Sequence, residues 1–175
     1  RKLLFMTYKA KPLSRAKIRQ HVIVLRETMK KIGYETGIEF PLLKFIEHVL
    51  PCVFPEFEFE VVDDNELNCY AKAYPSKNKI VVRNSVYEGA CRGNGRDRFT
   101  IAHEIGHFFL HDDENVSFAR MDEPILPFEN PEWQASTFAG ELLVPIDLIK
   151  GMGVEEISIK CKVSRQVAEI QKKYC

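Results

Sequence analysis

The chain has 175 residues, 45% of them hydrophobic, and its 25 basic side chains balance 25 acidic ones. This length predicts one domain with its own core and argues against two full domains. A formal net charge of zero gives no general reason to bind nucleic acid or an anionic membrane, and no stretch approaches the ~18 apolar residues of a membrane span.

The cysteines and the N-terminal residues indicate in which cellular compartment the protein is expected. Five cysteines, an odd number without a CxxC pair, fit neither a disulfide framework nor a thiolate zinc site. Residues 1–13 contain only a short apolar run, well below the length of a signal-peptide core. We therefore expect reduced thiols and a cytoplasmic protein.

Two amphipathic helices are expected within residues 14–50. The first should end near Gly33, and the second should follow Pro41 and stop at Pro51, because proline interrupts a helix. The apolar positions of the first helix recur at steps of three and four residues: Ile18, Val22, Leu25, Met29 and Ile32. Both helices are expected to be scaffold.

Residues 56–83 alternate between apolar and polar side chains, which is typical of short strands. Turn-forming residues at 63–65 and 75–78 divide the segment into about three strands, and an antiparallel meander is the simplest arrangement. The glycine-rich residues 89–95 are expected to form a loop. They lack the lysine and hydroxyl residue of a phosphate-binding loop.

Helices are expected again over residues 99–111 and 131–144. Helices before and after a small antiparallel sheet predict an α+β domain, which we assign to residues 1–150. Residues 151–175 are expected to form a short helical C-terminal appendage. With at most two short helices and no basic face, it should pack against the domain or a partner and not bind DNA.

The predicted helix over residues 99–111 contains an HEXXH motif, His103-Glu104-Ile105-Gly106-His107. Residues four apart share one helix face, so His103 and His107 can reach a single zinc ion. Glu104 is expected to be the general base that takes a proton from the attacking water. Gly106 should permit close approach of a neighbouring backbone. The alternative is a chance pair of histidines on a buried helix.

The third ligand is expected to be Glu132. The metzincin pattern requires glycine at 110 and histidine at 113, and the sequence has Leu110 and Asp113. Glu132 lies in the first turn of the next helix, on the same face as Ala135, where a carboxylate would be costly to bury without a cation. The alternative is a glutamate favoured only by the helix dipole.

Other candidates fit the site less well. Glu141 falls on the opposite side of its helix, Glu129 precedes the helix, and residues 112–114 follow His107 too closely to turn back. His111 lies one turn beyond His107. Because a catalytic zinc keeps one position open for water, we expect His111 to support a ligand or to contact the helix C-terminus, and not to bind the zinc itself.

Two segments together resemble the ImmA/IrrE metallopeptidase family. RFTIAHEIGH at residues 98–107 is similar to the family phrase RxxFTxAHExGH, and EWQASTFAGELLVP at residues 132–145 is similar to ExxANxFAxxLLMP. With a weaker similarity at residues 73–82, the resemblance covers roughly residues 67–145. Ser136, Gly140 and Val144 replace the usual Asn, Ala and Met.

The resemblance implies a zincin-like domain with His103, His107 and Glu132 as ligands of one zinc per chain and Glu104 as the catalytic residue. Family members act in prophages, other mobile elements or stress responses, where they relieve repression by cleaving a helix-turn-helix repressor. We therefore expect a zinc endopeptidase with such a repressor as its partner, bound as an added strand on the sheet edge.

Two other functions remain open. One is a zinc-containing antirepressor that binds its partner without cleavage, and the other is a toxin enzyme that acts on a different cellular protein. The residue that would stabilise the developing oxyanion is not fixed by the sequence. The candidates are Arg96, Arg98, Tyr70, Tyr74 and Tyr87.

Overall fold

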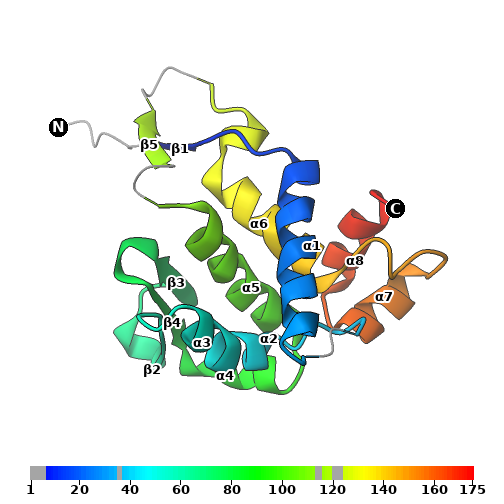
Figure 1. Ribbon diagram of the computed structural model, residues 1–175, viewed down its shortest axis with the longest axis horizontal. Coiled ribbons are helices and arrows are strands. Elements are labelled where there is room, and N and C mark those ends of the chain that lie inside the picture. The colour runs from blue at the N-terminus through cyan, green and yellow to red at the C-terminus, as the bar shows by residue number, and fades with distance from the viewer. Residues whose placement is uncertain (1–6, 35–36, 113–115, 120–123) are drawn as a thin grey trace.

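The computed structural model describes residues 7–34, 37–112, 116–119 and 124–175. A three-stranded sheet lies beside a group of helices, and a two-stranded sheet lies beyond one end of the two central helices (Figure 1). The predicted α+β class is confirmed. Among the described residues, none of the helices is long and apolar enough to cross a membrane.

The three-stranded sheet has the order β2-β4-β3, formed by β2 (Glu58–Val62), β4 (Lys79–Arg83) and β3 (Ala71–Tyr74). Strand β3 is antiparallel to β4, but β2 is parallel to it. The predicted antiparallel meander is therefore wrong in one pairing. The physical reason is that β4 carries the continuous buried run 80–82, which suits a central strand, whereas β2 keeps exposed positions and takes an edge.

A second sheet pairs β1 (Thr7–Ala10) with β5 (Val116–Ala119) in antiparallel register. Neither strand was predicted from the sequence. The two segments are more than 100 positions apart in the chain, and four-residue strands carry little periodic signal of their own. This pairing places residues 7–10 beside residues 116–119, beyond the C-terminal end of α5 (Figure 1).

The first helix, α1 (Arg15–Lys31), begins at the N-cap Ser14, whose side chain accepts a hydrogen bond from the backbone N–H of Lys17. Its apolar stripe is buried at Ile18, Val22 and Met29, as the periodicity predicted. Ile32 lies beyond the helix and is 50% exposed. Helix α1 packs against α6, which carries the second motif.

The second helical segment consists of α2 (Leu42–Lys44), one π-helical turn (Phe45–Val49) and α3 (Leu50–Val53). It continues past Pro51, so the predicted stop at that residue is wrong. Pro51 lies in the first turn of α3, where the missing backbone N–H is tolerated. The wider π turn lies just before it, with the Leu50 N–H donating to the Phe45 carbonyl.

Helices α4 (Asn84–Cys91) and α5 (Gly95–Leu110) flank a short turn. The prediction of a loop over residues 89–95 is therefore partly wrong, because residues 89–91 belong to α4. A Cβ atom at Gly89 would lie 1.8 Å from Asp97 Oδ2, so this glycine lets α4 pack closely on α5. Asn94 caps α5 by accepting hydrogen bonds from the backbone N–H groups of Arg96 and Asp97.

Helix α5 packs closely on α6 (Pro131–Leu143), whose N-cap is Asn130. A Cβ atom at Gly106 would lie 3.0 Å from the carbonyl oxygen and 3.1 Å from the Cα atom of Ala135. This close contact confirms the expectation that Gly106 allows a neighbouring backbone to approach. It also brings the HEXXH face of α5 opposite the first turn of α6.

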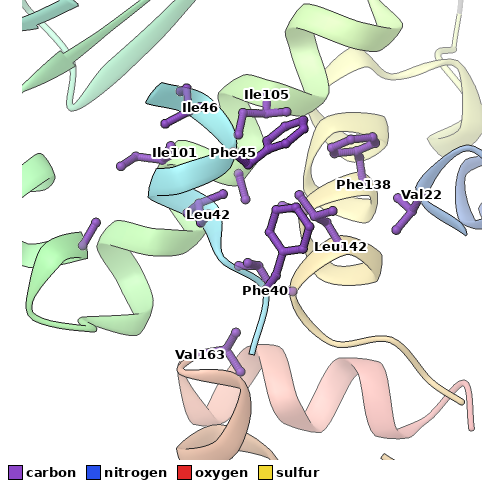
Figure 2. Close-up of a cluster of buried hydrophobic side chains, with 14 of the residues drawn as sticks. Val22, Phe40, Leu42, Phe45, Ile46, Ile101, Ile105, Phe138, Leu142 and Val163 are labelled. Carbon is purple, nitrogen blue, oxygen red and sulfur yellow. The ribbon is translucent and has the colours of Figure 1, made fainter. Parts of the chain in front are cut away.

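The two central helices, the second helical segment and α1 share one hydrophobic core (Figure 2). Phe45 lies between Ile105 of α5 and Phe138 of α6 in this view, and it makes an edge contact with Phe40 at 5.5 Å between the ring centroids. The C-terminal helices α7 (Val154–Cys161) and α8 (Arg165–Lys172) join the same core. Their buried contributions, with the turn between them, are Ile157, Cys161, Val163 and Ala168. The five cysteines are all free.

The docking of the C-terminal pair depends on Gly95. A Cβ atom there would lie 2.5 Å from the Val163 carbonyl carbon and 2.6 Å from the Ser164 nitrogen. We predict that Gly95→Ala lowers the free energy of unfolding by about 1–3 kcal/mol, because backbone atoms must move apart. Gly37→Ala, where nothing lies within 4 Å, is the control. Equal urea midpoints for the two variants would contradict this packing.

Candidate metal centre

Helices α5 and α6 bring three potential ligands together. His103 and His107 lie on one face of α5, with 3.0 Å between their Nε2 atoms. Glu132, in the first turn of α6, places Oε2 3.1 Å from His103 Nε2 and Oε1 3.1 Å from His107 Nε2. Among the described residues, these three form a group that could hold a metal ion.

The spacing of these three ligand groups fits a zinc ion. Ligand atoms about 2.0–2.1 Å from a tetrahedral zinc lie about 3.3 Å from one another. The observed separations of 3.0–3.1 Å, with a different Glu132 oxygen facing each histidine, are close to that value, so small side-chain adjustments would complete the geometry. Two imidazoles and one carboxylate also match the donor set of catalytic zinc sites that keep a fourth position open.

A relay of hydrogen bonds fixes the tautomer of His107. Gln134 donates its amide hydrogens to the carbonyl oxygens of Lys11 and Phe128, each at 2.7 Å, so its Oε1 must accept. His111 Nε2 lies 2.8 Å from that oxygen and donates to it. His111 Nδ1 is then the acceptor for His107 Nδ1, 2.8 Å away. The lone pair of His107 is therefore on Nε2, facing Glu132.

Ser136 has the same role for His103 as His111 has for His107. Its Oγ lies 3.1 Å from His103 Nδ1, so it can accept that proton and leave Nε2 with a lone pair. Serine therefore fills the position where the resembled family usually has asparagine, and it keeps a polar contact with the ligand. The two Nε2 lone pairs then face each other and the Glu132 carboxylate, a repulsive arrangement that a cation relieves.

The charge states of the surrounding groups agree with this arrangement. Burial lowers the pKa of His111 to about 4, so its ring is neutral near pH 7 and can accept from His107. Glu132 is exposed and lies in the first turn of α6, where the helix N-terminus favours the charged form of its carboxylate.

Glu104 follows the first histidine and reaches toward strand β3. Its Oε2 accepts a hydrogen bond from the backbone N–H of Ala73 at 2.7 Å. Burial raises the pKa of Glu104, although the nearby histidines and the Ala73 N–H act in the opposite direction. A fixed carboxylate with a raised pKa is suited to accept a proton near neutral pH.

The candidate centre opens into a cleft of about 700 Å³. Glu104, His107 and Glu132 line one part of this cleft, and residues 71–73 of β3 line another. Because β3 is at an edge of the three-stranded sheet, an extended peptide could pair with it next to the metal centre. An extended peptide on the β3 edge would therefore lie beside Glu104 and the candidate metal centre.

The other described acidic residues that were considered as the third ligand do not join His103 and His107. Glu141 is buried on the far side of α6, paired with Arg15 at 2.9 Å and with Arg19 at 2.8 Å. Glu129 pairs with Lys9 at 3.1 Å. Asp112 lines the cleft without joining the three-residue group, whereas residues 113–115 lie outside the described part of the chain.

The five candidates for oxyanion stabilisation do not line the cleft. Arg98 is buried and donates to the carbonyl oxygens of Lys162 and Phe40, and Tyr87 donates to Glu47 at 2.5 Å. The cleft is instead lined by Tyr8, which sequence reasoning did not select. Tyr8 reaches it through the pairing of β1 with β5, for which the sequence carries little signal.

Comparison with known proteins places this geometry in context. Residues 65–169 match the family described as the IrrE N-terminal-like domain, a peptidase family. Among solved structures, the chain is similar to a Mycobacterium tuberculosis transcriptional regulator, with a TM-score of 0.53 and 13% sequence identity. The match covers 90% of this chain and 50% of the other, so this chain spans half the length of that regulator. No curated protein gives a significant match.

We predict that the purified protein holds one zinc ion per chain and that Glu132→Ala loses it during dialysis against a weak chelator. The variant removes the carboxylate that faces both Nε2 atoms. Glu129→Ala, which removes a neighbouring acid outside the site, is the matched control. Inductively coupled plasma mass spectrometry gives the stoichiometry. Full occupancy of the Glu132 variant would remove this residue from the ligand set.

The relay through His111 should affect metal affinity. We predict that His111→Phe raises the zinc dissociation constant about 10–100-fold, since His107 loses the acceptor that orients it. Gln134→Leu should act in the same direction, and the double variant should be little worse than either single variant. Competition with a chromogenic chelator measures all three. Fully additive losses would indicate that the two residues act separately.

Proposed function

The chain belongs to the IrrE N-terminal-like peptidase family, and we propose that it is a zinc-dependent endopeptidase. Family membership indicates metallopeptidase activity. The observation that carries the proposal for this chain is the position of Glu104, which borders the same cleft as His107 and Glu132. His103, His107 and Glu132 would be the zinc ligands, and Glu104 would be the catalytic base.

The chain's own residues account for the steps of peptide hydrolysis. A zinc ion bound here would supply Lewis acidity for a water nucleophile and for the substrate carbonyl. Strand β3 would align an extended peptide along its edge. The Ala73 N–H holds the Glu104 carboxylate in place, and Glu104 would take the proton of the attacking water and deliver it to the leaving nitrogen.

We propose a helix-turn-helix repressor of a prophage or mobile element as the substrate. Support comes from the similarity of residues 98–107 and 132–145 to the ImmA/IrrE phrases, because members of that family relieve repression by cleaving such repressors. A comparable fold in a transcriptional regulator is consistent with a role in gene control. The proposal includes a cytoplasmic location, where a DNA-bound repressor is found.

The alternative function is an antirepressor that binds its partner without cleavage. Glu104 argues against it, because the side chain is half-buried, its pKa is raised by burial, and it faces the cleft. A protein that only binds would gain nothing from keeping a carboxylate there at a desolvation cost. The two functions predict opposite results for one substitution.

We predict that Glu104→Gln keeps zinc and fold but abolishes cleavage, since the amide keeps the shape and cannot accept a proton. Any helix-turn-helix repressor encoded in a neighbouring reading frame is the first substrate to test, with mass spectrometry to locate the cut. Glu27→Gln, an exposed residue of α1, is the control. Full relief of repression in cells by the Glu104 variant would favour the non-cleaving antirepressor.

The pH profile of cleavage provides a further check. The base must be deprotonated to act, so a raised pKa moves the acidic limb of kcat/KM to higher pH. We predict that the rate rises with pH across a midpoint above 4.5, the ordinary glutamate value. The control is a parallel measurement of zinc content at each pH. A limb at or below 4.5 would contradict the role of Glu104 as base.

A further inference from the structure

The residues that precede α1 form a segment that we call the N-terminal strap, residues 7–13. It runs from β1 to the start of α1 (Figure 1). Strand β1 pairs with β5, and Ala10 is only 3% exposed. The ion pair between Lys9 and Glu129 is partly exposed, and such pairs contribute little to stability. The position of the strap therefore depends mainly on the strand pairing and on the burial of Ala10.

The strap holds the side-chain amide of Gln134. The carbonyl oxygen of Lys11 accepts one amide hydrogen at 2.7 Å, and the carbonyl oxygen of Phe128 accepts the other at 2.7 Å. Phe128 is itself tied to the strap, because its carbonyl also accepts from the backbone N–H of Leu13 at 2.9 Å. Both acceptors that orient the buried Gln134 amide thus belong to the strap or are bonded to it.

The hydrogen bonds from Gln134 to His107 can run in either of two directions. In the observed arrangement Gln134 Oε1 accepts from His111 Nε2, and His111 Nδ1 accepts from His107 Nδ1, each at 2.8 Å. If the amide turned over, every donor would become an acceptor, and His107 would carry its proton on Nε2. A protonated nitrogen cannot bind a metal ion. Only the observed direction leaves His107 Nε2 ready for zinc.

We propose that the N-terminal strap sets the direction of this relay and thereby controls how tightly the protein holds zinc. The inference rests on the proposed zinc site. With the strap in place, a reversed amide would point Gln134 Oε1 at the carbonyl oxygens of Lys11 and Phe128, which repel it. Without the strap this preference is lost, and both tautomers of His107 become populated. The Lys11 carbonyl is a positioning group that acts on His107 through two other side chains.

The strap also connects the metal centre with the cleft. Tyr8 lines the cleft and lies two residues before Ala10 on the same side of β1. A peptide that contacts Tyr8 would stabilise the strap in its place and so tighten the hold on zinc. Because such coupling is reciprocal, zinc would in turn stabilise the strap and the part of the cleft wall that Tyr8 forms.

Two full-length variants make the same change at equally buried alanines. Ala10→Gln should displace the strap, whereas Ala90→Gln perturbs α4, away from the relay; both alanines are 3% exposed. Ala10→Gln should raise the zinc dissociation constant, measured by competition with a chromogenic chelator, about 10-fold or more. Ala90→Gln should leave it unchanged, even where it lowers the thermal midpoint. Equal dissociation constants for the two variants would overturn the proposal.

A combination with Gln134→Leu separates action through the relay from general destabilisation. This variant removes the amide that the strap orients, so adding Ala10→Gln should cause no further loss of zinc affinity. An additive loss would show that Ala10→Gln acts by another route and would contradict the proposal.

The tautomer of His111 gives a spectroscopic readout in the metal-free protein. Imidazole nitrogen chemical shifts from heteronuclear NMR should show His111 protonated on Nε2 in the wild type and a mixture of tautomers in Ala10→Gln. Ala90→Gln should match the wild type. A wild-type His111 protonated on Nδ1, or one tautomer shared by all three proteins, would contradict the role of the strap.

Hydrogen exchange of the backbone amides in residues 7–13 tests the reciprocal effect and does not depend on cleavage. Saturating zinc should slow this exchange in the wild type, and less so in Gln134→Leu. Coupling of zinc to the strap without cleavage of any repressor would keep the role of the strap and contradict the peptidase function. Cleavage by a protein whose zinc affinity and strap exchange are uncoupled would leave the peptidase standing and remove the coupling.

Discussion

The close contact between α5 and α6 is the constraint on which the candidate site depends. At Gly106 the two helices approach so closely that an added Cβ atom would lie 3.0 Å from the Ala135 carbonyl oxygen. That separation brings Glu132, three residues before Ala135, to 3.1 Å from both imidazole Nε2 atoms. A wider spacing would leave the carboxylate beyond reach of an ion held by His103 and His107.

Local features of the site could be predicted from the sequence because they depend on local geometry. The spacing of His103 and His107 is a property of any helix, and the Asn130-Pro131 start fixes where Glu132 enters α6. Features that depend on contacts between distant segments could not be predicted from the sequence. The parallel pairing of β2 with β4, and the strand that carries Tyr8, are set by tertiary contacts. The polar relay through Gln134 likewise joins segments more than 100 residues apart.

The C-terminal helices connect the hydrophobic core with the start of the HEXXH helix. Ile157 and Val163 complete the hydrophobic core, and the turn between α7 and α8 rests directly on Gly95 at the start of the HEXXH helix. Ile159 of α7 and Ile170 of α8 remain exposed, so the two helices are buried on one side and exposed on the other.

The central claim is that the two histidine Nε2 atoms and the Glu132 carboxylate hold one catalytic zinc ion. The most direct test is a crystal structure of the zinc-loaded protein with anomalous diffraction at the zinc edge. The account predicts a single peak about 2.0–2.2 Å from His103 Nε2, His107 Nε2 and a Glu132 oxygen, with His111 outside the coordination sphere. A peak bound by His111 or by an Nδ1 atom of either ligand histidine, or an ion that does not contact Glu132, would contradict it.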